Sequence, residues 1–363
     1  MSQRPLSAIV LAAGQGTRMR SARPKPLHML CGLPLVHYVL DAVAGCDAGT
    51  AVVVVGHSAE EVIKSLQQDG SPLPLEFVEQ RVQRGTGDAV AVGLTGLPDE
   101  PEDDDAEDGD VIVLPGDTPL VRPETLAALV LEHRLSGAAC TLLTARLDDP
   151  SGYGRVVRDK DGRVRRIVEH RDANAAELGI DEINTSIYVF RRSLLAPALR
   201  RIAPDNAQDE LYLTDVVEVL AGAGHPVVSL AATDPGETQG VNDRLQLSVA
   251  EAELRRRTNE HWMRSGVTIV DPAATYIDAL VTLAEDVTLF PGTMLRGTTS
   301  VGTGSEIGPG CRLTDTVVGE RVRMSESVAA LAEIGDGARV GPFAVLEPGT
   351  RVAPGVVIGP GPA

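Results

Sequence analysis

Cysteine is scarce in this chain of 363 residues, and the thiols lie far apart in the sequence. Cys31, Cys46, Cys140 and Cys311 form no Cys-x-x-Cys pair of the kind that binds zinc or exchanges disulfides. The chain is also too long to be a small secreted scaffold that depends on disulfides. We therefore expect reduced thiols and a cytoplasmic protein.

Long apolar runs are missing as well. No apolar stretch reaches the roughly 18 residues that a membrane-spanning helix needs. Residues 8–13 are apolar, but the run is too short and wrongly flanked to be a signal peptide. The sequence therefore predicts a protein without a membrane partner.

Positive charge is outnumbered, because 33 Lys and Arg residues face 51 Asp and Glu residues and the net charge is -18. Proteins that bind a nucleic-acid backbone depend on clustered Lys and Arg, so we expect no nucleic-acid partner. Much of the acidity falls between residues 99 and 110, a run that we interpret as a solvated, mobile loop.

One stretch does carry local positive charge next to glycines. Residues 6–11 form a short apolar run typical of a buried parallel strand, and Gly14 and Gly16 follow it. Glycine allows positive φ and close approach of the backbone to a ligand, while Arg18 and Lys25 add fixed charge. The stretch reads as a phosphate cradle or, alternatively, as a tight turn with two solvated basic side chains. It matches neither the Rossmann nor the Walker spacing.

Short β-rich runs alternate with amphipathic segments up to about residue 235. The clearest strand candidates are residues 52–55, 111–114 and 139–143, and the clearest helix candidates are residues 35–43, 59–67 and 123–134. This rhythm predicts an α/β fold with a Rossmann-like, mostly parallel sheet covered on both faces. Ligands bind such sheets beyond the carboxyl ends of the strands.

Several polar residues follow these strands. Gln80 precedes a Gly85-Thr86-Gly87 turn and offers both a donor and an acceptor to a nucleobase edge. Asp117 ends an apolar strand, where a hard oxygen suits Mg²⁺ but also a simple turn. Further along, Gly154 permits close backbone approach, and Glu169 and Asn184 can bind sugar hydroxyl or amide groups; each is also a plausible turn or surface residue.

The C-terminal part has a different texture. After Gly266, an aliphatic residue followed by a small one recurs at six-residue spacing, at positions 301, 307, 313, 334, 340, 352 and 358. Such hexapeptides build a β-helix whose aliphatic side chains point inward and stack. Because 363 residues exceed what one core usually serves, we expect a first domain over residues 1–239, a helical arm over 240–266 and a β-helix over 267–363.

The string Leu-Ala-Ala-Gly-Gln-Gly-Thr-Arg-Met at residues 11–19, with Pro24-Lys25 after it, resembles the signature of the sugar-1-phosphate nucleotidylyltransferases. Strings similar to that family's other motifs follow in the same order: Q-x-x-x-x-G-T-G from residue 80, G-D-x-P-L from 116, Y-G-R from 153, I-V-E from 167, E-I-N-T from 182 and G-V-N from 240. Together with the repeat, they most resemble the bifunctional enzymes that combine N-acetylglucosamine-1-phosphate uridylyltransferase with glucosamine-1-phosphate acetyltransferase.

The resemblance implies roles for individual residues. Arg18 and Lys25 would be catalytic, and Asp117 and Asn242 would bind Mg²⁺, although Asn242 or Asp243 could instead cap the following helix. The sugar contacts would be Gly154, Glu169 and Asn184. The nucleotide contacts would be Leu11, Ala12, Ala13, Gly14, Gly16, Thr17, Gln80, Gly85 and Thr86. The repeat would be a left-handed β-helix, which commonly assembles as a trimer.

Some residues depart from the family's pattern. Pro26, Pro115, Asp88 and Ser186 stand where that family usually has valine, an aromatic residue, histidine and glycine. The resemblance makes UTP and N-acetylglucosamine-1-phosphate the first substrate prediction, whereas these departures favour the alternative of another sugar or cyclitol phosphate with UTP, dTTP or GTP. A non-catalytic nucleotide-sugar-binding scaffold is a further alternative. Glu347 replaces an arginine and the later acetyltransferase strings have no counterpart, so we expect no acetyltransferase activity.

Overall fold

The computed structural model describes residues 4–98 and 108–359, which divide into two compact units. Within the described residues, the first unit comprises residues 4–28 and 34–246, and the second comprises residues 29–33 and 247–359. We keep the division after residues 239 and 266 as a proposal about which segments fold together.

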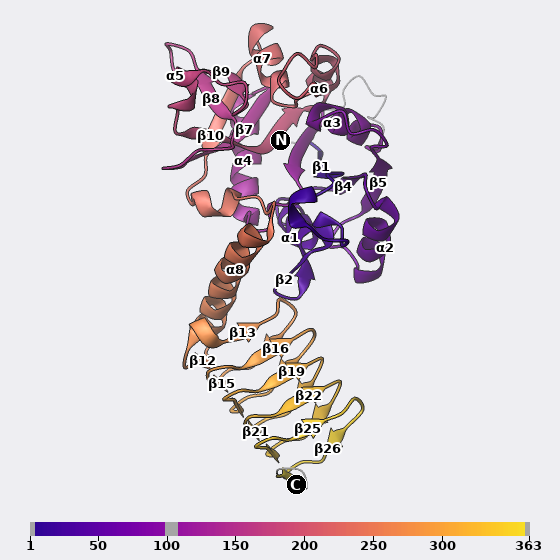
Figure 1. Cartoon of the computed structure of the whole chain (residues 1–363), viewed down its shortest axis with the longest axis vertical. Helices are drawn as coiled ribbons and strands as arrows, with labels where there is room; N and C mark the ends of the chain where they lie inside the picture. The colour runs from indigo at the N-terminus through magenta and orange to yellow at the C-terminus, as the bar shows by residue number, and fades with distance from the viewer. Residues whose placement is uncertain (1–3, 99–107, 360–363) are drawn as a thin grey trace. The chain divides into compact units, whose positions relative to one another are not determined.

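The first unit is built on a nine-stranded sheet (Figure 1). Its main path runs β11-β7-β10-β6-β1-β4-β5, and β8 pairs with β10 and β9. The pairs of β1 with β4 and β6, of β4 with β5 and of β7 with β11 are parallel, whereas β10 runs antiparallel to β6, β7 and β8. The strands are β1 Leu6–Ala12, β4 Thr50–Val55, β5 Leu75–Glu79, β6 Asp110–Pro115, β7 Cys140–Arg146, β8 Arg155–Arg158, β9 Val164–Val168, β10 Glu182–Arg191 and β11 Val227–Ala231. Two-residue strands β2 Met29–Leu30 and β3 Leu33–Pro34 lie apart from this sheet.

Helices cover both faces of the sheet, because its central strands are apolar on both sides. In β1, Ala8 and Val10 pack with side chains of α1, α2 and α4, while Ile9 packs with side chains of α3, α6 and α7. The helices are α1 Leu35–Ala44, α2 Ala59–Asp69, α3 Thr86–Leu94, α4 Pro123–Ser136, α5 Ala175–Leu178, α6 Arg192–Leu199 and α7 Asp215–Gly222, with short 3-10 turns η1 Thr17–Met19, η2 Lys25–Leu27 and η3 Pro235–Thr238. This layering confirms the predicted α/β class.

The acidic run is interpreted wrongly at its last residue. Residues 99–107 lie outside the described residues, but Asp110 begins β6 with 1% of its surface exposed. Its carboxylate accepts a hydrogen bond of 2.9 Å from Arg134 Nε. Burial by itself would raise the pKa of Asp110, yet hydrogen bonds from His133 and Arg134 hold it below its usual value. A buried carboxylate needs such partners because desolvating an unpaired charge is costly.

The C-terminal repeat folds as predicted. Successive coils stack on one another, and their short strands form three parallel sheets in which each strand pairs with its equivalent in the next coil (Figure 1). Aliphatic side chains at the predicted repeat positions, Val301, Ile307 and Leu313 among them, form the buried core. These sheets confirm the predicted β-helix of hexapeptide repeats.

The strands of this β-helix occupy three columns. They are β12 Thr268–Ile269, β15 Thr288–Leu289, β18 Glu306–Ile307, β21 Arg323–Met324, β24 Arg339–Val340 and β27 Val357–Ile358; then β13 Tyr276–Ile277, β16 Met294–Arg296, β19 Arg312–Thr314, β22 Val328–Ala330 and β25 Val345–Leu346; and finally β14 Thr282–Leu283, β17 Ser300–Val301, β20 Val317–Val318, β23 Glu333–Ile334 and β26 Arg351–Val352. A 3-10 turn, η4 Pro272–Ala274, lies between β12 and β13.

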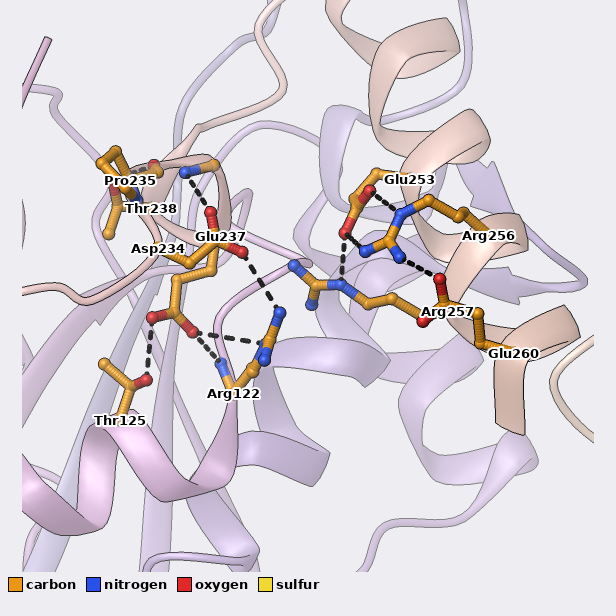
Figure 2. Close-up of polar contacts among 11 residues, drawn as sticks. Arg122, Thr125, Asp234, Pro235, Glu237, Thr238, Glu253, Arg256, Arg257 and Glu260 are labelled. Carbon is orange, nitrogen blue, oxygen red and sulfur yellow. Dashed lines mark hydrogen bonds and ion pairs between the residues drawn. The ribbon is translucent and has the colours of Figure 1, made fainter. Parts of the chain in front are cut away.

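The predicted arm is helix α8, Arg244–Arg264. Each arginine of the basic triplet at residues 255–257 has a side-chain partner. Figure 2 shows Glu253 accepting hydrogen bonds from Arg256 and Arg257, and Arg256 donating to Glu260 at 2.6 Å. The Arg255 guanidinium lies 4.7 Å from the ring centre of Tyr276. Pairs spaced three or four residues apart meet on one helix face, which explains the ion pairs of Arg256 and Arg257.

Candidate active site

A cavity of about 500 Å³ opens in the first unit, where β1 and β6 end. Residues from the ends of β1, β5, β6 and β9 line it, together with β10 and the segment at residues 208–214. Parallel strands bring their carboxyl ends to one edge of a sheet, which is where such folds bind ligands. The volume lies in the range typical of small-molecule sites.

The structure brings most of the predicted site residues together. Those that line the cavity are Leu11, Ala12, Ala13, Gly14, Lys25, Gln80, Gly85, Thr86, Asp117, Glu169, Asn184 and Asn242. Gly16, Thr17, Arg18 and Gly154 do not line it. Arg18 nevertheless contacts a lining residue, and a Cβ at Gly154 would lie 3.4 Å from both carboxylate oxygens of Glu169.

The two glycines of the opening loop differ. Gly16 has φ +62, and a Cβ there would lie 2.6 Å from Lys25 Cβ, so both the backbone and the space favour glycine. Gly14 needs no positive φ, and no atom would lie within 4 Å of its Cβ. The prediction that glycine is needed for positive φ therefore holds at Gly16. It does not hold at Gly14, which lines the open cavity.

Lys25, Asp117 and Asn242 meet at one point of the cavity. Lys25 Nζ donates to an Asp117 carboxylate oxygen and, at 2.8 Å, to Asn242 Oδ1. Arg18 Nη2 donates to the same Asn242 oxygen at 2.9 Å. The Val241 amide donates to the Asp117 carbonyl at 2.8 Å, so the two segments are also joined through their backbones. The two side-chain oxygens thus converge on a single cation position.

Asp243, not Asn242, caps the following helix. Its Oδ1 accepts a hydrogen bond of 2.8 Å from the Gln246 amide. An acidic side chain in this role satisfies a free N–H at the helix start. The alternative role considered for Asn242 is therefore filled by its neighbour, and the Asn242 oxygen is left to the cations.

Glu237 supports the segment that carries Asn242, and the sequence reasoning did not find it. The side chain is 1% exposed; Oε1 accepts from Thr125 Oγ1 at 2.8 Å and Oε2 from the Arg122 amide at 3.2 Å (Figure 2). Arg122 in turn donates to Asp234 at 3.1 Å. These bonds join η3 to the start of α4. An acid just before Gly-Val-Asn was the available signal, but nothing in its spacing points to a partner more than 100 residues away.

Gln80 lies at the nucleobase end predicted from the sequence. It is 5% exposed, and its Nε2 donates to the Gly85 carbonyl at 3.1 Å and to Asp88 Oδ2 at 2.8 Å. Gly85 has φ +110, and a Cβ would lie 2.5 Å from the Leu211 carbonyl oxygen. The expectation that Gln80 offers both a donor and an acceptor is therefore wrong in part, because both N–H groups are already used.

At the predicted sugar end, Glu169 and Asn184 are held by neighbours. Glu169 accepts from Thr214 Oγ1 at 3.2 Å, and Asn184 Nδ2 donates to the Tyr188 hydroxyl at 2.7 Å. Burial raises the pKa of the Glu169 carboxyl; nearby Asp215 and Asp172 raise it further, against the lowering effect of the Thr214 hydrogen bond. A carboxyl with a raised pKa titrates closer to neutral pH.

The sequence reasoning missed much of one wall. It named no site residue between positions 206 and 215, yet several residues there line the cavity: Gln208, Glu210, Tyr212, Leu213 and Thr214. It also gave no role to Gln83, whose Nε2 donates to the Ala13 carbonyl at 2.5 Å.

Asp215 predicts a pH-dependent stability. Desolvation raises its pKa to about 6, helped by Glu218 and Asp172. The protonated carboxyl of the folded protein therefore contributes fully to the free energy of unfolding below pH 3.8, and this contribution is lost as the pH rises through 6. Asp215→Asn should therefore be more stable than the wild type above pH 6, by about 1 kcal/mol after discounting for solvent screening, and no more stable below pH 4. Urea unfolding at pH 8 and pH 4 measures this, with Glu124→Gln, an exposed acid in the first turn of α4, as control. An equal effect at both pH values would contradict it.

Residues 4–98 and 108–359 contain neither a metal-binding cluster of acidic, His or Cys side chains nor a membrane-spanning helix. No group of three or more His, Cys, Asp or Glu side chains in these ranges is arranged to hold a metal ion. None of the helices described there is long and apolar enough to cross a membrane. The cytoplasmic location stays a prediction.

Comparison with known proteins decides the class of chemistry. The profile of the family described as Nucleotidyl transferase matches residues 7–262. The chain belongs to this family. As a nucleotidyl transferase, it is 46% identical over 349 residues to "Bifunctional protein GlmU" of Streptomyces avermitilis, a match that covers 96% of this chain and 71% of the relative. It is 48% identical over 347 residues to the protein of that name from Kineococcus radiotolerans, covering 96% and 69%, and 42% identical over 343 residues to that of Shouchella clausii, covering 94% and 73%.

The family resemblance and the enzyme class inferred from the sequence are thereby confirmed. This nucleotidyl transferase aligns with its relatives through both the sheet and most of the β-helix. The individual roles of its site residues stay predictions.

Proposed function

We propose that this nucleotidyl transferase transfers UMP from UTP to N-acetylglucosamine-1-phosphate, giving the UDP-sugar and pyrophosphate. One observation carries the proposal: Lys25, Asp117 and Asn242 meet in the same cavity that Gln80 and Asn184 line. Charge for phosphates, an amide for a base and polar groups for a sugar are thus available to one ligand pair.

The proposed step needs no nucleophilic side chain. An oxygen of the sugar phosphate attacks the α-phosphorus of UTP, and the bond from that phosphorus to the bridging oxygen breaks, its electron pair leaving with pyrophosphate. Catalysis then consists of aligning two anions and offsetting their charge. Arg18 would stabilise the triphosphate and the departing pyrophosphate, and Lys25 the sugar phosphate and the α-phosphate.

Asp117 and Asn242 fit a magnesium ion. Both contribute hard oxygen donors, and both contact the same Lys25 ammonium, so they can share one cation. A bound Mg²⁺ would neutralise phosphate charge and orient the two substrates. Lys25 would then give up this position and turn to the phosphates, which links its two roles.

Lys25 and a divalent cation should therefore compete. Removing the ammonium in Lys25→Met is expected to tighten Mn²⁺ binding to the nucleotide-free protein about tenfold, because a like charge leaves the site. Electron paramagnetic resonance of free Mn²⁺ measures this without any turnover. The exposed Lys64, on α2, gives the control Lys64→Met. Unchanged affinity in Lys25→Met would contradict the shared cation position.

The reaction itself is tested with a matrix of nucleoside triphosphates against sugar and cyclitol phosphates, with Mg²⁺ and a pyrophosphate-release readout. We expect UTP with N-acetylglucosamine-1-phosphate to be the most productive pair. Pro115 and Ser186 line the cavity beside Asp117 and Asn184, which supports the alternative of a different sugar or cyclitol phosphate with UTP, dTTP or GTP. Silence across the matrix would favour the scaffold alternative.

We also propose that copies of the chain assemble through the β-helix, as a trimer. Mass measurement in solution tests this separately from turnover. The absence of acetyltransferase activity likewise stays a prediction, tested by acetyl transfer from acetyl-CoA to glucosamine-1-phosphate.

A further inference from the structure

The side-chain amide of Gln80 has only one orientation that satisfies its neighbours. Its nitrogen faces the Gly85 carbonyl oxygen at 3.1 Å and Asp88 Oδ2 at 2.8 Å. Both partners accept hydrogen bonds and an ionised carboxylate cannot donate, so the NH₂ group must point at them. An amide has two N–H groups, and both are used. Oε1 accepts no hydrogen bond from the residues that the structure describes.

The two groups that hold Gln80 sit on a well-anchored helix start. Gly85 precedes α3 and Asp88 lies in its first turn. The Gly87 amide donates to the Leu211 carbonyl at 2.8 Å, and the Leu213 amide donates to Thr86 Oγ1 at 3.0 Å. A Cβ at Gly85 would lie 2.5 Å from the Leu211 carbonyl oxygen, and a Cβ at Gly87 would lie 2.5 Å from Ile202 Cδ1. The acceptors therefore cannot easily turn away from Gln80.

The carbonyl oxygen is consequently the group that Gln80 presents to the cavity, which it lines. Uracil and thymine carry a ring N–H on the pairing edge, as guanine does, whereas cytosine and adenine carry a lone-pair nitrogen there. An acceptor held opposite this ring position forms a hydrogen bond with the N–H of the first group of bases, and it faces the lone pair of the second. A buried polar group without its partner lowers affinity strongly.

We propose that Asp88 is a positioning residue that fixes Gln80 with its carbonyl toward the nucleotide, so that the site selects bases with a ring N–H and rejects cytosine. The inference rests on the proposed function, since it concerns the nucleotide of that reaction. It also gives a role to a residue that departs from the usual histidine of the resembling family.

A competing role for Asp88 is purely structural. It is the acidic residue in the first turn of α3, where negative charge interacts favourably with the helix dipole. That role affects the stability of the helix and the binding of all nucleotides alike. The preference between nucleotides separates the two roles.

The test compares kcat/KM for UTP and CTP, with the same sugar phosphate, in the wild type, Asp88→Asn and Asp88→Ala. We expect the wild type to prefer UTP by about 100-fold. Asparagine can donate as well as accept, so in Asp88→Asn only the Gly85 carbonyl still requires the Gln80 nitrogen, and the preference should fall about tenfold. Alanine leaves the same single acceptor and should lower the preference at least as far. Glu60→Gln removes an acid from the first turn of α2 and serves as the matched control, with an unchanged ratio.

A binding measurement keeps the inference separate from the proposed function. Calorimetry of the wild-type protein with UTP, CTP and 3-methyl-UTP, which lacks the ring N–H, measures binding without turnover. It also does not depend on whether an Asp88 variant folds. The wild type should bind UTP about 100-fold more tightly than either analogue. Equal binding of the three nucleotides, or a UTP preference that stays within twofold of wild type in both Asp88 variants, overturns the inference. UTP-selective binding without pyrophosphate release would instead overturn the proposed function alone.

Discussion

Asp117→Asn is expected to lower kcat/KM for pyrophosphate release about 1,000-fold while leaving the fold intact. The substitution keeps the shape of the side chain but removes the charge that pairs with Lys25. It also removes the only carboxylate of the proposed Asp117 and Asn242 cation site, and charge stabilisation of this kind contributes several kcal/mol to phosphoryl transfer. Initial rates at saturating Mg²⁺ with both substrates measure the effect.

The control for Asp117 is Asp181→Asn, which changes an exposed aspartate that forms a surface ion pair with Arg146. Surface pairs contribute little, so this variant should keep wild-type turnover. Circular dichroism and thermal unfolding of both variants establish that the fold is retained. A rate for Asp117→Asn within threefold of wild type would remove Asp117 from the catalytic machinery.

Arg18→Ala is expected to lower turnover by about 100-fold or more, because a preorganised positive group at the leaving pyrophosphate is lost. Arg18 is exposed, and among the described residues its side chain donates one hydrogen bond, of 2.9 Å, to Asn242. Its loss should therefore barely change the free energy of unfolding. Steady-state pyrophosphate release and urea unfolding together separate the two effects.

Arg23→Ala provides the matched control, since Arg23 is exposed on the same loop. If the two arginine variants lose activity equally, the effect comes from the net charge of the loop rather than from the position of Arg18. Near-wild-type turnover in Arg18→Ala would refute its assignment. Arg18 does not line the cavity, which makes this the most demanding test of the residues carried over from the family.

The elements of the fold were predictable because their signals are local and periodic. The strand at the start of the chain follows from a continuous apolar run around Ile9. The β-helix follows from aliphatic residues that recur at fixed spacing, such as Ile307 and Val340. Polar residues after strands were also predictable, because parallel strands place them at one edge of the sheet. Asp117 and Gln80 were found in this way.

The sequence failed where a side chain is defined by distant partners. Asp110 looks like part of an acidic loop, yet Arg134 and His133 on α4 make it a buried, paired carboxylate. Residues 206–215 have no periodic pattern, and only their packing against the start of α3 places Tyr212 and Thr214 in the cavity wall. Glu237 likewise depends on Arg122 and Thr125.

The sequence by itself thus determined the α/β class, the repeat and the chemical types of the side chains at the strand ends, since periodic burial and motif spacing are properties of the chain. The tertiary structure decided how those side chains are used. It placed the Lys25 ammonium between the Asp117 and Asn242 oxygens, and it turned the Gln80 amide so that Asp88 holds its nitrogen. Such orientations depend on hydrogen-bond partners brought together by folding, and no local pattern records them.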